Sequence, residues 1–169
     1  MVSLFCCGCG SGATAPTRRS ALERYLAEIE PIRLSVNRLL EAADPVLGGF
    51  AAGHISRATA ARRIGSLERR FAKYAVRVAA VRPRNDELRA LHEPYAETYV
   101  LEDSYLSALT VGIAEDKLDD LPNTQNAQRA AIIRWRTRLT VLAQELHAQL
   151  PPDLQRAGRG EIAPSPGGS

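Results

Sequence analysis

The sequence has no cysteine after residue 9, few aromatic residues and no long apolar run. Its three cysteines, Cys6, Cys7 and Cys9, all lie in the first ten residues, so no disulfide bond can form within the body of the chain. No stretch reaches the roughly 18 consecutive apolar residues of a membrane-spanning helix, which excludes such a helix from the chain as written. Aromatic residues make up only 5% of the chain, so the core is expected to be mainly aliphatic.

Sequence motifs for catalysis and metal binding are also missing. The chain contains no His-Glu-x-x-His motif, no Gly-rich phosphate-binding loop and no Gly-x-Ser-x-Gly elbow. His54, His92 and His147 lie in separate segments, and the lack of a Glu-x-x-His pair disfavours a ferritin-like di-iron site. We therefore expect a protein that is not an enzyme and that holds no metal or other cofactor.

The body of the chain is rich in Ala, Leu and Arg, which are good helix formers, whereas Gly and Pro cluster near its ends and in one internal segment. Apolar residues recur at alternating spacings of three and four, which predicts amphipathic helices and an all-α protein. The four predicted helices cover about residues 20–43, 56–81, 86–119 and 125–150.

Local signals predict how the first and third helices begin and bend. Ser20 and Glu23 have the spacing of a capping box, in which each side chain satisfies a free backbone N–H of the other residue. Pro31 and Pro94 lie inside the helical patterns and should kink both helices, because proline lacks an N–H and crowds the preceding turn.

Short connections between the predicted helices favour an antiparallel four-helix bundle with proline-kinked helices. The bundle domain is expected over residues 19–150. Residues 1–18 would form a cysteine-bearing start and a flexible linker, and residues 151–169 a mostly disordered tail. Residues 44–55 would form either a short turn of helix or a loop.

Charge is divided between two adjacent segments. Residues 45–84 contain nine cations and one anion, a net charge of +8, whereas residues 85–121 contain ten anions and two cations, a net charge of −8. The favoured interpretation is that opposite charges pair the second and third helices as neighbours. Alternatively, the second helix binds an anion on an acidic partner, either nucleic acid or anionic lipid. The candidate anion-binding residues are Arg62, Arg63, Arg69, Arg70 and Lys73. Nucleic acid is disfavoured, because the chain lacks a helix-turn-helix spacing.

A possible polar site lies in the third helix. Glu102 falls inside the apolar stripe, and Tyr95, Tyr99 and His92 lie on nearby turns. A desolvated carboxyl group has a raised pKa unless a partner stabilises its charge, and such groups sometimes mark functional sites. The alternative is that Glu102 is a satisfied polar group of the core, paired with an arginine or a tyrosine hydroxyl.

The start of the chain, Leu4-Phe5-Cys6-Cys7-Gly8-Cys9, resembles the end of a bacterial lipoprotein signal peptide. In that family an apolar run and a small residue precede the cysteine that becomes lipidated. The resemblance implies lipidation of Cys9 and a tether to the extracytoplasmic face of the cell membrane. The chain departs from the pattern because its first cation is Arg18 and its apolar run is short, and a start codon upstream of Met1 would supply both features.

Other interpretations of these cysteines remain open. Cys6 or Cys7 could instead be palmitoylated, or the start could be unstructured with free thiols. Cys6 and Cys9 have a Cys-x-x-Cys spacing, but zinc would need two further ligands and the chain has no cysteine after Cys9.

The body also resembles the uncharacterised helical lipoproteins of high-GC bacteria, in its composition and in its run of Leu88, Leu91, His92 and Tyr95. No activity follows from that resemblance. The sequence thus leads to a non-enzymatic, membrane-tethered lipoprotein that acts as a binding or structural module, with an unknown protein partner. The alternative is a cytoplasmic helical bundle that binds an acidic partner through its second helix. A third hypothesis, an enzyme that uses Glu102 and neighbouring tyrosines, requires a concave polar pocket.

Overall fold

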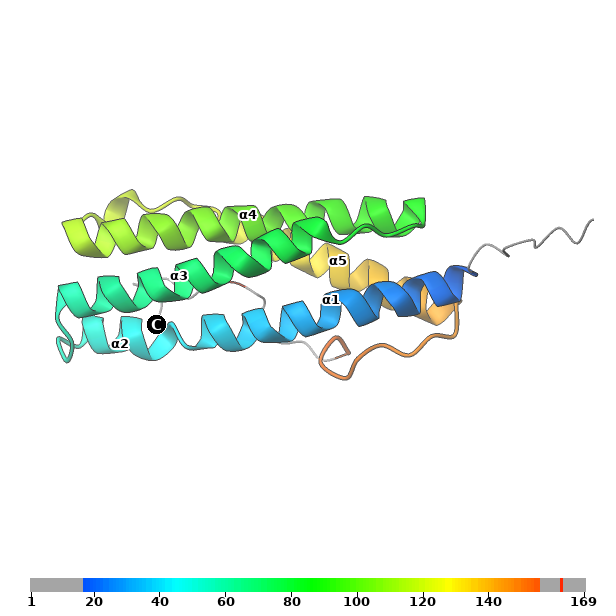
Figure 1. The fold of residues 1–169 in the computed structure, drawn as a ribbon, viewed down its shortest axis with the longest axis horizontal. Helices are drawn as coiled ribbons and strands as arrows, with labels where there is room; N and C mark the ends of the chain where they lie inside the picture. Colours follow the sequence, from blue (N-terminus) through cyan, green and yellow to red (C-terminus); the bar gives the residue numbers. More distant parts are fainter. Residues whose placement is uncertain (1–16, 156–161, 163–169) are drawn as a thin grey trace, which may run out of the picture.

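The computed structural model describes residues 17–155 and residue 162, and all regular secondary structure in them is helical. The prediction of an all-α protein is therefore confirmed, and four long helices pack against one another (Figure 1). The elements are α1 (Arg18–Glu41), α2 (Asp44–Ala51), α3 (Arg57–Ala80), α4 (Asp86–Glu115), the short 3₁₀ helix η1 (Leu118–Asp120) and α5 (Gln125–Glu145).

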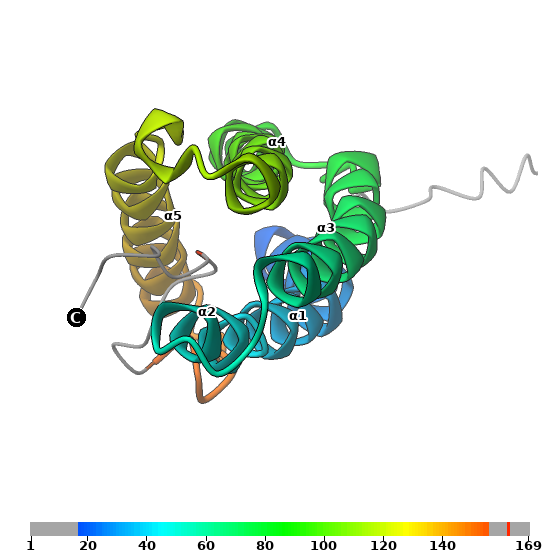
Figure 2. The same ribbon diagram turned by 90° about the vertical axis from the view of Figure 1, so that its left-hand side faces the viewer.

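The four long helices surround a common core, and α2 packs beside the start of α3 (Figure 2). The most extensive helix contact joins α3 to α4, which confirms that the two oppositely charged segments are neighbours. Gly65 permits this close approach, since a Cβ atom there would lie 3.1 Å from Cγ2 of Thr110. By contrast, α1 and α5 make little direct contact with each other.

The first helix starts earlier than the sequence predicted. Thr17 is the N-cap of α1, and its side chain accepts a hydrogen bond from the N–H of Ser20 at 3.2 Å. The predicted capping box of Ser20 and Glu23 is wrong, because Thr17 already satisfies the free N–H and Ser20 lies inside the first turn. Glu23 instead forms an ion pair with Arg19 at 2.9 Å.

The later helix ends also follow from local chemistry. Asn85 caps α4 by accepting a hydrogen bond from the N–H of Leu88. That helix stops at Glu115, before the predicted end, because Asp116 adopts a left-handed conformation with φ of 63°. For residues 44–55 the sequence allowed either a short turn of helix or a loop. They contain the helix α2, with Pro45 in its first turn. Both α1 and α4 continue through their internal prolines.

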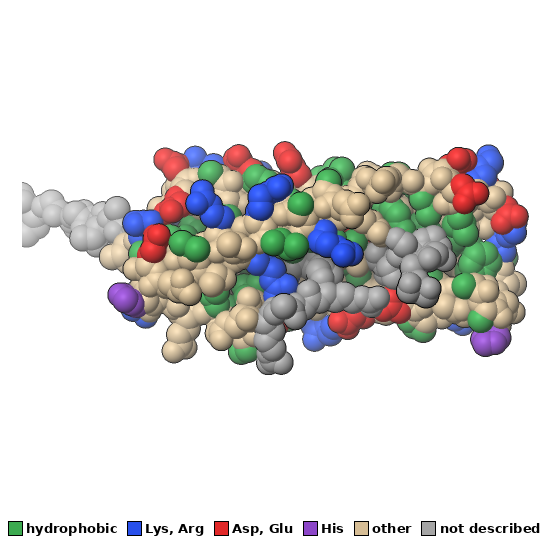
Figure 3. All heavy atoms as spheres, turned by 180° about the vertical axis from the view of Figure 1, so that it is seen from behind, with side chains coloured by type: hydrophobic (Ala, Val, Ile, Leu, Met, Phe, Trp, Pro, Cys, Tyr) green, Lys and Arg blue, Asp and Glu red, His purple; other side chains and the backbone are tan. Residues whose placement is uncertain are grey.

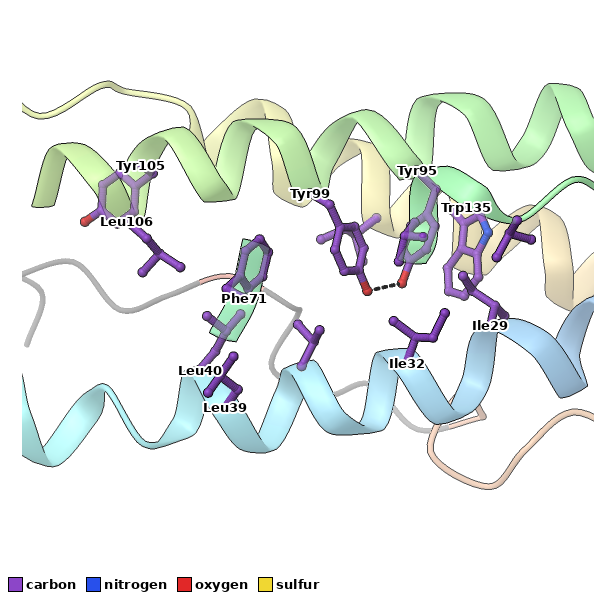
Figure 4. Close-up of a cluster of buried hydrophobic side chains, with 14 of the residues drawn as sticks. Ile29, Ile32, Leu39, Leu40, Phe71, Tyr95, Tyr99, Tyr105, Leu106 and Trp135 are labelled. Atoms are coloured by element: carbon purple, nitrogen blue, oxygen red, sulfur yellow. Dashed lines mark hydrogen bonds between the residues drawn. The ribbon is translucent and has the colours of Figure 1, made fainter. Parts of the chain in front are cut away.

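The core combines aliphatic side chains with a row of aromatic rings. Ile29 and Ile32 of α1 lie below Tyr95 and Tyr99 of α4, with Trp135 of α5 beside them (Figure 4). The Tyr95 ring stacks on the Trp135 ring with 4.0 Å between centroids. The aromatic residues are few in number, but several of them lie at the centre of the bundle.

Residues 146–155 bridge the gap between α1 and α5. Arg33 of α1 is 2% exposed and forms ion pairs with Glu30, at 2.9 Å, and with Asp153. The guanidinium of Arg136 in α5 donates to the backbone oxygen of Asp153 at 2.6 Å. Leu154 is buried against the core. The chain after the last helix therefore adds contacts to both helices that border the gap.

Candidate functional site

The residues of the predicted polar site all lie on the buried face of α4. Relative exposure is 4% for His92, 0% for Tyr95, 2% for Tyr99 and 1% for Glu102. They therefore share a helix face, as predicted, but the face is turned into the core.

His92 connects two helices. Its Nδ1 lies 3.1 Å from the hydroxyl of Tyr25 in α1, and its Nε2 lies 3.1 Å from the backbone oxygen of Val78 in α3. Burial lowers the pKa of His92, since the charged imidazolium is disfavoured away from water. A neutral ring with its proton on Nε2 donates to Val78 and accepts from Tyr25, so both nitrogens are satisfied.

Tyr95 and Tyr99 form a hydrogen-bonded pair with 2.8 Å between their hydroxyl oxygens. The Tyr99 ring stacks on Phe71 of α3, at 5.7 Å between centroids, and Tyr95 stacks on Trp135. These rings join α3, α4 and α5 in one layer of the core. Trp135 anchors the last helix in the core, with 2% of its surface exposed.

Glu102 is hydrogen-bonded inside the core. The side-chain amide of Gln128, from α5, donates to Oε2 of Glu102 at 3.1 Å and lies 3.3 Å from the backbone oxygen of Thr98. Gln128 is fully buried, and its Oε1 atom has no hydrogen-bond partner. The sequence analysis missed Gln128, although a glutamine between apolar helix positions is a signal for such a partner. A carboxylate enclosed in this way offers a substrate no access.

The candidate anion-binding residues form an exposed basic surface on α3. Five exposed residues make up what we call the α3 basic surface: Arg62, Arg63, Arg69, Arg70 and Lys73. None of these five side chains forms an ion pair with any residue that the structure describes. The ion pair that joins α3 to α4 is instead Arg57 with Asp116, at 2.7 Å. Contact between the two helices therefore leaves most of the positive charge of α3 open to solvent.

A groove between the first half of α4 and the second half of α5 was not predicted. It has a volume of about 670 Å³, and Tyr95 and Trp135 form its floor. Its apolar walls are formed by Ala90, Leu91, Pro94, Ala131, Ile133, Val141 and Leu142. Its polar lining consists of Glu87, Arg134, Thr137, Arg138 and Glu145. We call this the α4–α5 groove. Figure 3 shows the face opposite to that of Figure 1, where Lys and Arg side chains lie among hydrophobic ones.

Arg18 links the two acidic residues of the groove lining. Its guanidinium lies 2.7 Å from Glu87 at the start of α4 and 3.8 Å from Glu145 at the end of α5. These ion pairs raise the pKa of Arg18. The sequence signal for the groove was weak: Arg134 and Arg138 are four residues apart, with Trp135 between them.

A second groove of about 740 Å³ lies between α1 and the chain after α5. Leu26, Pro31 and Leu34 line it from α1, and Leu150 and Pro151 line it from the other side. Its wall therefore depends on the ion pair that holds Asp153.

Searches of the described residues and comparisons with known proteins give no assignment. In residues 17–155 and 162, no group of three or more His, Cys, Asp or Glu side chains is placed to hold a metal ion. No helix in that part of the chain has the length and apolar character to cross a membrane. Cys6, Cys7 and Cys9 lie outside the described residues. Comparison with protein-family models, with curated proteins and with solved structures finds no match.

Proposed function

We propose that this chain is a non-enzymatic binding module that a lipid on Cys9 holds at the extracytoplasmic face of the cell membrane. The observation that carries the binding role is the α4–α5 groove, an apolar concave surface with two aromatic rings at its floor. Grooves of several hundred Å³ with mostly apolar walls and a few charged groups are typical of ligand sites. The tether rests on the resemblance of Leu4–Cys9 to a lipoprotein signal.

The spacing between Cys9 and the bundle fits a tether. Thr17 caps α1 and lies eight residues after Cys9, so the linker spans at most about 27 Å when extended. A lipid on Cys9 would therefore keep the bundle within a short distance of the membrane surface.

We also infer that the bundle is antiparallel and that Pro31 and Pro94 bend their helices. The short connections support the first point, since only residues 81–85 lie between the end of α3 and the start of α4. The chain direction in Figure 1 supports it too, because the colour sequence runs in opposite directions along α1 and α3. The bends are supported by the missing N–H of each proline, which removes one hydrogen bond from the helix.

Metabolic labelling tests the tether. The protein is expressed from its native gene in the presence of a radioactive fatty acid, and the membrane fraction is examined for labelled protein. The label and the membrane association should both be lost in Cys9→Ala. The matched control is the double variant Cys6→Ala, Cys7→Ala, which should keep both. A Cys9→Ala protein that stays labelled and membrane-bound would show that the proposed tether is wrong, and loss of label in the double variant would favour palmitoylation.

The second candidate function is a cytoplasmic bundle that binds an acidic partner. The α3 basic surface favours it, because its five exposed cations have no ion-pair partner among the described residues. Binding to vesicles of anionic phospholipid, or to duplex DNA, should then weaken steeply with salt, as counterion release requires. Replacing Arg62, Arg63 and Arg69 by Gln should abolish the binding at moderate salt. Absence of binding at low salt, or binding that ignores salt, would remove this candidate.

A further inference from the structure

The rim of the α4–α5 groove carries positive charge that has no partner in the bundle. Arg134 and Arg138 lie four residues apart on α5 and are exposed, and neither forms a hydrogen bond or ion pair with a described residue. The two acidic residues of the lining, Glu87 and Glu145, are both engaged by Arg18. The groove is thus apolar along its floor, neutralised at one end and cationic along its α5 rim.

The dimensions of the groove favour a narrow ligand. The lining extends from Ala131 to Glu145 on α5, about 20 Å of helix. Spread over that length, a volume of about 670 Å³ corresponds to a mean cross-section of roughly 30 Å². That cross-section accommodates a single extended hydrocarbon chain.

We propose that the α4–α5 groove binds a long-chain fatty acid. The hydrocarbon chain lies along Leu91, Trp135 and Val141, with its methyl end toward Glu87 and Glu145. The carboxylate lies at the rim, where Arg134 and Arg138 supply charge-assisted hydrogen bonds. This inference deepens the binding role proposed above and does not depend on the lipid at Cys9.

Trp135 provides a direct signal for occupancy. It is the single tryptophan of the chain and forms part of the groove floor. A fatty acid brominated along its chain, such as dibromostearate, quenches tryptophan fluorescence on contact. Titration of the full chain with dibromostearate below its micellar concentration should give saturable quenching, and unbrominated oleate should reverse it. Quenching that does not saturate, or that oleate does not reverse, would overturn the proposal.

The carboxylate contact is tested separately. The double variant Arg134→Gln, Arg138→Gln should bind dibromostearate about tenfold more weakly or worse, because the anion loses both charged donors. Its matched control is Arg24→Gln, Arg129→Gln, which changes two exposed arginines outside the groove lining and should bind as the unmodified chain does. The methyl ester of the acid should bind the unmodified chain weakly. Its affinity should be the same for the double variant Arg134→Gln, Arg138→Gln. Equal binding of ester and acid would show that the head-group assignment is wrong, whether or not the double variant folds.

A variant that fills the groove tests its location. Ala90 is exposed and lines the groove, whereas Ala79 is exposed on α3 and does not. Ala90→Phe should reduce fatty-acid binding by about tenfold or more, and Ala79→Phe should leave it unchanged. If both bind equally, the acid contacts Trp135 by another route and the proposal is wrong. The proposal is also wrong if sedimentation shows that the unmodified chain is a dimer and that Ala90→Phe dissociates it. The groove would then be an interface between two copies of the chain.

Failure of this inference can be distinguished from failure of the proposed tether. Labelling at Cys9 and quenching of Trp135 are independent measurements on different parts of the chain. Quenching without Cys9 lipidation leaves the fatty-acid site in place and removes the membrane tether. Cys9 lipidation without saturable quenching supports the membrane tether and removes the fatty-acid site. Saturable binding of a lysophospholipid in place of the free acid would also overturn the proposal, since the acid is the ligand to which it commits.

Discussion

The indole N–H of Trp135 donates a hydrogen bond to the hydroxyl of Tyr25 at 2.9 Å, across 110 positions of sequence. The same hydroxyl lies 3.1 Å from Nδ1 of His92, whose Nε2 lies 3.1 Å from the backbone oxygen of Val78. One chain of hydrogen bonds therefore passes through α5, α1, α4 and α3 in turn. Together with the contacts of Asp153 to Arg33 and Arg136, it links α1 to α5, which make little direct contact with each other.

Tyr25→Phe should destabilise the bundle. The substitution keeps the ring but removes the acceptor of the Trp135 N–H, and a buried donor left without a partner costs about 1–3 kcal/mol. Urea unfolding followed by circular dichroism measures the change. In a Trp135→Phe background, which removes the donor as well, the cost of Tyr25→Phe should be clearly smaller. Equal costs in the two backgrounds would show that this hydrogen bond carries no coupling energy.

The stability of the bundle should depend on pH through His92. Burial lowers the pKa of His92 in the folded state, whereas the unfolded chain takes up a proton at the ordinary pKa of about 6.5. The unfolded state therefore binds more protons below about pH 6.5, and the free energy of unfolding falls as the pH drops from there toward the lowered pKa. Above about pH 6.5 this contribution is fully present.

Urea unfolding at several pH values between 5 and 7.5 measures this dependence. His92→Gln should flatten the curve in that range, because it removes the titrating group. His147→Gln is the control, since His147 is exposed and makes no contact with the hydrogen-bond chain. An unchanged slope in His92→Gln would contradict the assignment to His92.

Asp153→Asn should loosen the chain after α5. Arg33 is buried and would keep its ion pair with Glu30. Its ion pair with Asp153, which holds residues 146–155 against α1, would be lost. Because the Asp153 side chain is 38% exposed, solvent screens the pair, and we expect a cost of about 1 kcal/mol. Limited proteolysis and amide hydrogen exchange within residues 146–155 should speed up by about fivefold. Glu23→Gln, which breaks the exposed pair with Arg19, should change neither rate.

Periodic and local features of the sequence predicted the fold class well. The three-four spacing of apolar residues reports which face of a helix is buried, so the buried faces of α4 and α5 could be predicted. The opposite charges of the second and third helices predicted that they are neighbours. The start of α1 could not be assigned correctly, because Thr17 and Ser20 are both acceptable caps and packing of the first turn decides between them.

The candidate site was harder to predict, because it depends on distances between helices. The sequence placed Glu102 on an apolar face but did not show that Gln128 of α5 donates to it. The α4–α5 groove depends on how the two helices are spaced and oriented, and neither has a signature in the apolar spacing of either helix. Likewise, the +8 segment suggested pairing with its neighbour, but the five cations of the α3 basic surface lie exposed to solvent without an ion pair to a described residue.

Asp103→Asn should stabilise the bundle at neutral pH. Asp103 is half-buried on α4, its Oδ1 atom is buried without a hydrogen-bond partner, and burial raises its pKa. A raised pKa means that the folded state binds a proton at Asp103 more tightly than the unfolded state does. The charged carboxylate therefore opposes folding as the pH rises above the ordinary pKa of aspartate. Asparagine has nearly the same shape and no charge. The free energy of unfolding should therefore rise by about 0.5–1 kcal/mol at pH 7, with a smaller gain at pH 4 where part of Asp103 is already protonated.

Glu97→Gln is the control, since Glu97 is exposed on the same helix and should change stability little at either pH. A loss of stability in Asp103→Asn at pH 7 would mean that the carboxylate makes a favourable charge interaction that outweighs its desolvation.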